Sequence, residues 1–138
     1  GPFNRKSTLW GSWAIKDKNI NIYFSGDTGY GDHFKDIGKD YGPFDLVLLD
    51  TGQYNSAWKY SHMFPFESVR AAKDLNSQFF MPIHWAGFTL SKHPWDEPIK
   101  KSIEYAEKEG MRYIAPMIGE IISNKELNKN FIEWWNKY

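Results

Sequence analysis

The amino-acid sequence predicts an α/β layered fold, and three observations lead to that prediction. Residues 46–49 form a continuous apolar run between Asp45 and Asp50, which is typical of a strand covered on both faces. Residues 65–76 and 95–109 carry apolar side chains at helical spacing. Strands and helices alternate along the chain, as in sheets whose functional residues lie on loops beyond the strand ends.

The composition limits what the protein can do. The chain has 138 residues, the size of one domain, and its 17 Lys and Arg balance 17 Asp and Glu. No long-range field attracts polyanions, so nucleic acid is not an expected partner. The chain has no cysteine, which excludes disulfides, thiolate metal sites and a cysteine nucleophile. A transition-metal site must therefore use His, Asp or Glu.

The apolar and aromatic residues indicate where the protein is located and whether the chain is part of a longer protein. No apolar run approaches the roughly 20 residues that span a bilayer, and the N-terminus lacks a signal pattern. We therefore expect no transmembrane segment and a cytoplasmic location. Aromatic residues make up 18% of the chain, so we expect apolar surface that more protein normally covers. Gly1-Pro2 resembles the remnant of a cleaved tag, and we expect the chain to be part of a longer protein.

The first elements are expected to be a hairpin and a central strand. Residues 8–15 and 20–25 are apolar runs joined by a polar turn at residues 16–19. Residues 34–41 then form a short segment of weak periodicity that ends at Gly42. The buried strand at residues 46–49 follows this segment.

The middle of the chain predicts two helices with a strand between them. Pro65 and Glu67 suit the first turn of a helix at residues 65–76. Residues 78–81 are typical of a strand, and residues 95–109 of a second helix.

The C-terminal part predicts two short strands and a last helix. The strands are expected at residues 111–116 and 119–122. Ser123 and Glu126 have the spacing of a capping box, which favours a helix starting there. An apolar stripe on that helix would consist of Leu127, Phe131, Trp134 and Trp135.

Three polar residues are candidates for a functional site. Asp27, His62 and His84 each lie in a loop that follows a predicted strand. Loops after parallel strands gather at one edge of a sheet, so these side chains could converge. Asp and His together suit zinc or a similar cation. A catalytic zinc usually has three protein ligands, and His62 is the candidate for the third.

Each of these residues also has a purely structural explanation. Asp27 lies between glycines, where its carboxylate could simply support a turn. His62 precedes a helix, which it could cap or pack against, and His84 could be hydrogen-bonded in the core. We expect His33 and His93 to be surface or loop residues. The sequence has no nucleophile elbow, phosphate loop or paired glycosidase carboxylates.

Several motifs, in chain order, resemble the C-terminal half of metallo-β-lactamase-fold hydrolases, and in particular the N-acyl-phosphatidylethanolamine phospholipase D-like group. They are Phe3-Asn4-Arg5 with Thr8-Leu9-Trp10, the stretch FSGDTGY at residues 24–30, His62-Met63 before Pro65, and Ile83-His84-Trp85 with Phe88. The resemblance implies half of an αββα sandwich, a mixed sheet with flanking helices, over residues 1–138. It also implies two metal ions at one edge, usually zinc, with manganese or iron as alternatives.

The resemblance also implies roles for individual residues. Asp27 matches the family's metal-bridging aspartate and His84 its last histidine ligand. His62 matches a catalytic histidine beside the pocket, which orients the substrate phosphate or a leaving group. Tyr30 and Trp85 are the expected substrate-binding residues. The metals in such sites lower the pKa of a bound water and neutralise the developing oxyanion.

The chain departs from the family pattern in two ways. Phe64 stands where relatives often place Asn before the helix-starting Pro, which removes a favourable N-cap. The His-x-His-x-Asp-His motif, which supplies most metal ligands in the family, does not occur in these residues. We therefore expect that motif in an N-terminal half outside this chain.

The resulting hypothesis is a fragment of a zinc-dependent hydrolase, most simply a phosphodiesterase. We expect the isolated chain to bind zinc weakly, to be inactive, and either to self-associate or to pair with the missing half. The expected substrate is a phosphodiester or lipid-like small molecule. Two alternatives stay open, a lactonase or other small-substrate hydrolase and a non-catalytic binding or assembly module.

Overall fold

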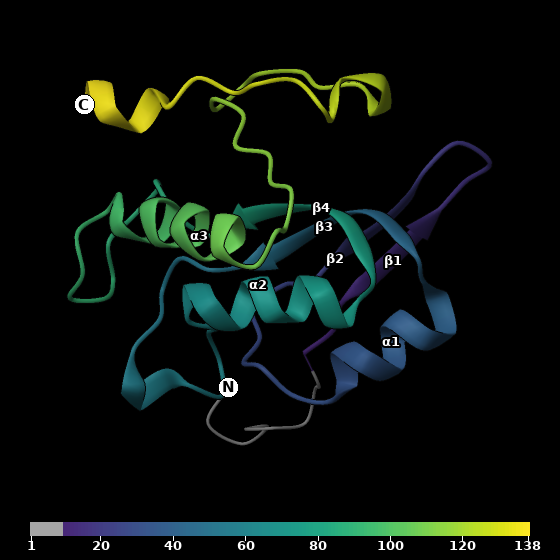
Figure 1. Ribbon diagram of the computed structural model, residues 1–138. Coiled ribbons are helices and arrows are strands. Elements are labelled where there is room, and N and C mark those ends of the chain that lie inside the picture. Colours follow the sequence, from purple (N-terminus) through teal and green to yellow (C-terminus); the bar gives the residue numbers. More distant parts are fainter. Residues whose placement is uncertain (1–9) are drawn as a thin grey trace.

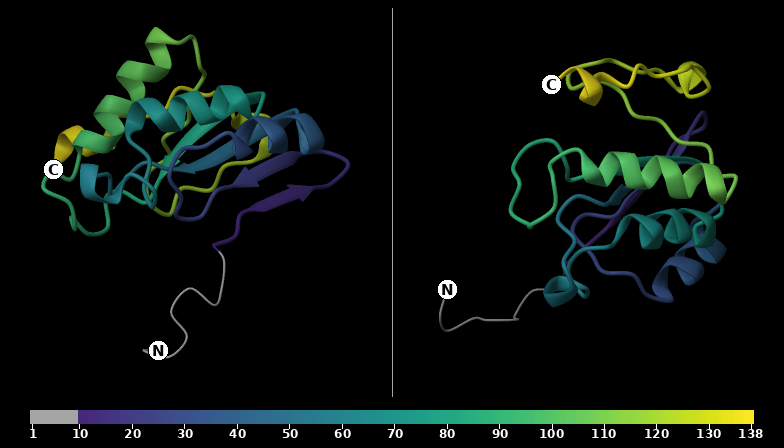
Figure 2. Two further views of the ribbon diagram at one scale, coloured as in Figure 1. Left: turned by 90° about the horizontal axis from the view of Figure 1, so that it is seen from below. Right: turned by 60° about the vertical axis from the view of Figure 1, so that its left-hand side comes forward.

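The fold is a four-stranded sheet with helices on one face and an irregular C-terminal segment across the other. The structure is a computed structural model and describes residues 10–138. In Figure 1 the C-terminal segment runs on the opposite side of the strands from α2, and the second view of Figure 2 shows the same separation. This arrangement confirms the predicted α/β class.

The sheet has the strand order β1-β2-β3-β4. Its strands and helices, in chain order, are β1 (Trp13–Lys16), β2 (Asn21–Phe24), α1 (His33–Tyr41), β3 (Phe44–Asp50), α2 (Pro65–Asp74), β4 (Ser77–Ile83) and α3 (Glu97–Lys108). β1 pairs antiparallel with β2, whereas β2, β3 and β4 run parallel. The carboxyl ends of three strands therefore meet at one edge of the sheet.

The central strand β3 is buried on both faces, as its apolar run predicts. Val47 and Leu49 belong to the core beneath the helices, together with Phe80 of β4. Leu46 packs on the other face with Phe79 and with residues of the C-terminal segment. Burial on both faces explains why this strand carries a continuous apolar run rather than an alternating one.

The predicted hairpin forms, with a shorter first strand. β1 begins at Trp13, so residues 10–12 of the expected strand lie outside it, and residues 8 and 9 lie outside the described part of the chain. The turn is stabilised by the Asp17 carboxylate, which accepts hydrogen bonds from the backbone N–H groups of Asn19 and Ile20. The strand end is therefore set by local side-chain chemistry.

The helix α2 begins at Pro65, as predicted. Phe64 has no capping side chain, and the Glu67 carboxylate instead accepts the Phe64 backbone N–H at 2.9 Å. The loss of Asn at position 64 is thus partly offset by Glu67. The residues beyond β3 then reach the helix through a short 3-10 turn, Ser56–Trp58.

The predictions for the C-terminal strands were wrong. Residues 111–116 form only an isolated bridge, between Phe80 and Tyr113, and residues 119–122 form no strand. Pro116 lacks a backbone N–H, so it cannot donate to a continuing ladder. A left-handed residue, Gly119 with φ of +86°, then turns the chain away from an extended path.

The predicted last helix was also wrong. Ser123 and Glu126 do form the capping box, but it opens only a 3-10 turn, Asn124–Glu126, and a second such turn covers Trp134–Lys137. The apolar residues of the segment pack in two separate clusters, Leu127 beside Leu46 and the two tryptophans beside Ile99. Burying these apolar residues in two separate places stabilises the segment more than a single helix would. The several Asn residues of the segment are also poor helix formers.

Large apolar side chains remain exposed at the first strand and in the C-terminal segment. They are Trp13, Ile15, Met117, Ile118, Ile121 and Ile132. Within the described residues, no helix has the length and apolar character needed to cross a membrane.

Candidate metal centre

Four acidic and imidazole side chains meet at the carboxyl edge of the sheet. Asp27 follows β2, Asp50 ends β3, His62 lies in the loop between β3 and α2, and His84 follows β4. One potential ligand atom from each residue lies within 4.8 Å of the others. The structure thus brings together Asp27, His62 and His84, as the strand order predicts, and adds Asp50.

Asp50 lies at the centre of the cluster and is fully buried. Its Oδ2 atom lies 2.8 Å from Nδ1 of His62, and its Oδ1 atom lies 3.1 Å from Nδ1 of His84. The Thr28 backbone N–H donates to Oδ2 at 3.3 Å. A buried carboxylate needs such partners, because an unpaired charge away from water is very costly.

Asp27 is more exposed and is held by its loop. Its side chain is 61% exposed, and its Oδ1 atom lies 3.5 Å from Nδ1 of His84. Gly29 in this loop donates its backbone N–H to the Tyr60 carbonyl, and a Cβ atom there would lie 2.4 Å from the Lys59 carbonyl oxygen. Only glycine allows this close contact with the loop that carries His62.

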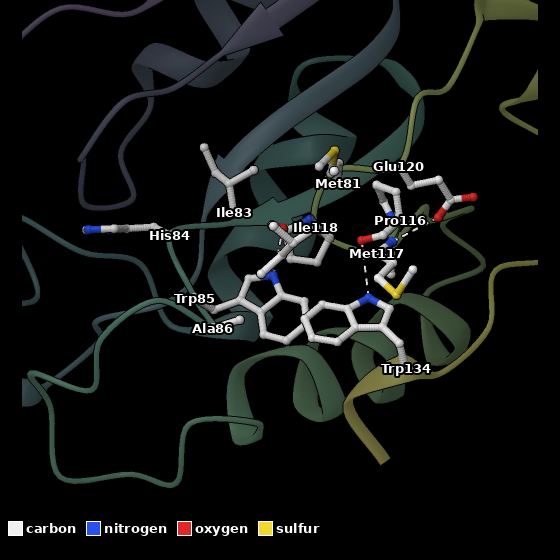
Figure 3. A pocket seen from close by; sticks show the side chains of 13 residues that line it. Met81, Ile83, His84, Trp85, Ala86, Pro116, Met117, Ile118, Glu120 and Trp134 are labelled. Carbon is white, nitrogen blue, oxygen red and sulfur yellow. Dashed lines mark hydrogen bonds between the residues drawn. The ribbon is translucent and has the colours of Figure 1, made fainter. Parts of the chain in front are cut away.

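His84 has a left-handed backbone with φ of +69°, which is rare outside glycine. The loop after β3 packs directly on it, since a Cβ atom on Gly52 would lie 1.5 Å from the His84 carbonyl oxygen. Strained backbone of this kind persists only where the surroundings fix it, and it is common at functional sites. In Figure 3 the His84 imidazole points away from Trp85 and Trp134.

The two residues expected to bind substrate lie outside this cluster. The Trp85 indole N–H donates to the Pro82 carbonyl, and its ring stacks on Trp134 in a cavity of about 300 Å³ (Figure 3). The Tyr30 hydroxyl donates to Asp74 at 2.5 Å. Burial and this contact raise the pKa of Tyr30 to about 12. Substrate-binding roles for Tyr30 and Trp85 stay predictions.

The other two histidines lie outside the cluster, as predicted. His33 is at the start of α1, with its ring 4.1 Å from that of Phe34. His93 stacks on Tyr54 with a ring separation of 4.2 Å.

The donor set of two carboxylates and two imidazoles fits a borderline cation such as zinc. The 2.8 and 3.1 Å separations from Asp50 to Nδ1 of His62 and Nδ1 of His84 fit hydrogen bonds. The exposed Asp27 carboxylate lies on the same side of the His84 ring, 3.5 Å from Nδ1. Asp27, and His84 through its other ring nitrogen, are the candidate metal ligands.

Asp50 is the site residue that the sequence reasoning missed. A signal for it existed, because an acidic residue closes an otherwise apolar strand that is covered on both faces. A carboxylate in that position must be paired, and the polar residues after the neighbouring strands are the natural partners. The partners themselves could not be identified without the loop conformations.

A known protein family matches the first part of the chain. Residues 1–85 match the family model described as the beta-lactamase superfamily domain. The chain belongs to the beta-lactamase superfamily. The resemblance to its metallo-hydrolases and to the phospholipase D-like group within them is confirmed by the relatives described next.

Among the superfamily relatives, an uncharacterised protein of Mycobacterium tuberculosis is 46% identical over 120 residues, which cover 85% of this chain and 32% of the relative. An N-acyl-phosphatidylethanolamine-hydrolyzing phospholipase D of Caenorhabditis elegans is 39% identical over 85 residues, covering 59% of this chain and 24% of that protein. The chain therefore spans about a third of the mycobacterial relative, and less of the nematode protein.

Solved structures share the fold. Igni18, a metallo hydrolase from the archaeon Ignicoccus hospitalis, superposes with a TM-score of 0.60 at 21% sequence identity. The match covers 78% of this chain and 42% of Igni18. The present chain thus has the fold of this hydrolase and carries a candidate metal-binding group. Its substrate and its metal are taken up under the proposed function.

Proposed function

We propose that the chain is the C-terminal half, over residues 1–138, of a zinc-dependent phosphodiesterase of the phospholipase D-like kind. The observation that carries the proposal is the convergence of Asp27, His62 and His84 around buried Asp50 at the carboxyl edge of the sheet. The match to a phospholipase D relative supports the reaction class.

In this proposal Asp27 and His84 hold metal. The exposed Asp27 carboxylate faces His84 at 3.5 Å, and within the described residues no hydrogen bond to this carboxylate competes with a cation. Bound metal would supply an activated water and neutralise charge that develops on phosphate oxygens. Two ligands from this chain leave room for further ligands from the rest of a larger site.

His62 would act on the substrate rather than hold the metal. Its ring centroid lies 5.2 Å from that of His84, so it borders the metal position. Its side chain is 16% exposed and is fixed on one side by Asp50. An imidazole so placed can donate a hydrogen bond to a phosphate oxygen or a proton to a leaving group.

The rest of the site would come from an N-terminal half that carries the His-x-His-x-Asp-His motif. The chain matches 42% of Igni18 and about a third of the mycobacterial relative, which supports this division. Ile118, Ile121 and Ile132, each at least 71% exposed, support a surface that the other half or a second copy covers. The isolated chain would then bind zinc weakly and be inactive.

The proposal is tested by comparing the 138-residue chain with the same chain joined to its N-terminal half. Tight, stoichiometric zinc binding by calorimetry and hydrolysis of a model phosphodiester should both appear only in the joined protein. Stoichiometric zinc and hydrolysis by the isolated chain would contradict the inactive half. A joined protein that cleaves only lactones, or that holds no metal, would favour the two alternatives raised from the sequence.

Variants of the joined protein test the individual roles. His84→Ala should lose zinc, whereas His62→Ala should keep zinc and lose about 100-fold or more in turnover. His93→Ala, whose ring stacks on Tyr54 outside the cluster, is the matched control and should retain both. Equal turnover in His62→Ala and His93→Ala would contradict the role of His62.

A further inference from the structure

We propose that Asp50 is a positioning residue that holds both His62 and His84 in the tautomer with the proton on Nδ1. The consequence for metal and substrate rests on the proposed function. The tautomers themselves are properties of the metal-free chain, so they can be tested separately.

The first support is the hydrogen bonding of a buried carboxylate. Asp50 has no exposed surface, so its oxygens must find donors within the protein. An ionised carboxylate only accepts hydrogen bonds. Among residues 10–138, three candidate donors lie within reach, namely Nδ1 of His62 at 2.8 Å, Nδ1 of His84 at 3.1 Å and the Thr28 N–H at 3.3 Å.

The opposite tautomers would leave this carboxylate almost unpaired. With protons on Nε2, both Nδ1 lone pairs would face carboxylate lone pairs at 2.8 and 3.1 Å. In the described part of the chain, only the Thr28 N–H would remain as a donor, at the long distance of 3.3 Å. A buried charge without partners is strongly destabilising, so the Nδ1–H form is favoured for both rings.

The second support is that Asp50 itself is rigidly held. Its backbone N–H donates to the Ser25 hydroxyl at 2.9 Å, and its carbonyl oxygen accepts from the Ser68 hydroxyl at 2.7 Å. It also lies opposite Ile83, the residue before His84, in the β3–β4 register. A fixed carboxylate can therefore fix the direction of two imidazoles that come from different loops.

The consequence is that both Nε2 lone pairs are free. His84 can then offer Nε2 to a cation, and His62 can offer Nε2 to the substrate. A carboxylate on the other ring nitrogen is the usual way in which proteins orient a metal-binding histidine and set its tautomer. Here a single carboxylate serves two histidines, one oxygen for each.

The first experiment uses the chain labelled with ¹⁵N-histidine and treated with a chelator. Long-range ¹H–¹⁵N correlation spectra at about pH 8, above the ordinary imidazole pKa of about 6.5, report which nitrogen carries the proton. We expect Nδ1–H for His62 and His84. His33 provides an internal reference for a ring outside the cluster. Protons on Nε2 of His62 and His84 in the unaltered chain would overturn the proposal without any variant.

The second experiment uses Asp50→Asn. An amide has one acceptor oxygen and one donor nitrogen, so it can accept from one imidazole and must donate to the other. We expect one of the two histidines to change to the Nε2–H tautomer and the other to stay. Asp36→Asn, an exposed aspartate of α1, should leave both unchanged. Unchanged tautomers in a folded Asp50→Asn chain would overturn the proposal.

Zinc binding connects the inference to the proposed function. In the protein joined to its N-terminal half, Asp50→Asn should weaken zinc binding about 10- to 100-fold, as is typical when such a partner is lost. Absence of zinc in the unaltered joined protein, with both tautomers as expected, would contradict the function and leave the tautomer inference standing. If the joined protein binds zinc but its two histidines are Nε2–H tautomers, the tautomer inference is contradicted and the proposed function stands.

Discussion

Gly52 lies against His84 so closely that a Cβ atom on Gly52 would be 1.5 Å from the His84 carbonyl oxygen. The loop after β3 is thereby in direct backbone contact with the residue that follows β4. His84 has a left-handed backbone, with φ of +69°, at this contact.

The first prediction follows from that contact. Gly52→Ala should force the two backbones apart, with a loss of about 1–3 kcal/mol in the free energy of unfolding, as for other overpacked sites. Urea unfolding measures the loss. Gly87→Ala is the control, because a Cβ atom there meets no atom within 4 Å. Equal stability of the two variants would show that the backbone can shift at no cost.

The second prediction concerns the loop between β4 and α3. The buried Gln53 side chain donates to the Phe88 carbonyl at 2.6 Å and accepts from the backbone N–H groups of Leu90 and Ser91. Gln53→Ala should leave these groups unpaired and cost about 1–3 kcal/mol of stability. Amide exchange at Leu90 and Ser91 should become faster. Gln78→Ala, at an exposed position of β4, should leave both exchange rates unchanged.

The third prediction concerns alkaline pH. Burial and the hydrogen bond to Asp74 raise the pKa of Tyr30 to about 12, from an ordinary value of 10.0. A raised pKa means that this hydroxyl stabilises the fold fully below about pH 10 and loses that contribution as the pH approaches about 12. Unfolding measured over this range should therefore show a fall in stability that is smaller in Tyr30→Phe. Tyr60→Phe, which removes an exposed hydroxyl, should keep the full fall.

The fourth prediction concerns self-association. Ile121 is 91% exposed in the C-terminal segment, beside other exposed apolar residues of that segment. If the surface pairs with a second copy, Ile121→Asp should lower the apparent mass of the isolated chain in light scattering at high concentration. Asn124→Asp, at a nearby exposed position, makes the same change in charge and is the control. A monomeric unaltered chain with no bound polypeptide would contradict self-association.

Much of the fold follows from the sequence because local and long-range preferences agree there. The apolar run of β3 and the Pro65 start of α2 both appear where the pattern places them. The C-terminal segment differs because its capping box and apolar stripe favour a helix, while the sheet face and Ile99 bury its residues at separate positions. Burial in the tertiary structure therefore outweighs the local preference for a helix.

The sequence likewise predicts one part of the candidate site and not the other. The loops that carry Asp27, His62 and His84 could be located because each follows a strand, and parallel strands place such loops at one edge. Asp50 could not be assigned, because its role depends on two imidazoles turning toward it. Those directions come from the φ of +69° at His84 and from the contacts at Gly29 and Gly52. Glycine contacts of this kind have no periodic signature.

The sequence distances within the candidate metal centre bear on how it could be transferred to another protein. Asp50 contacts Thr28, His62 and His84, which lie 22, 12 and 34 residues away along the chain. No short peptide contains all four, and none would bring them together without three paired strands. A graft of this centre onto another scaffold would therefore need the parallel β2–β3–β4 unit, with α1 and α2 as its two crossovers, rather than the loops alone.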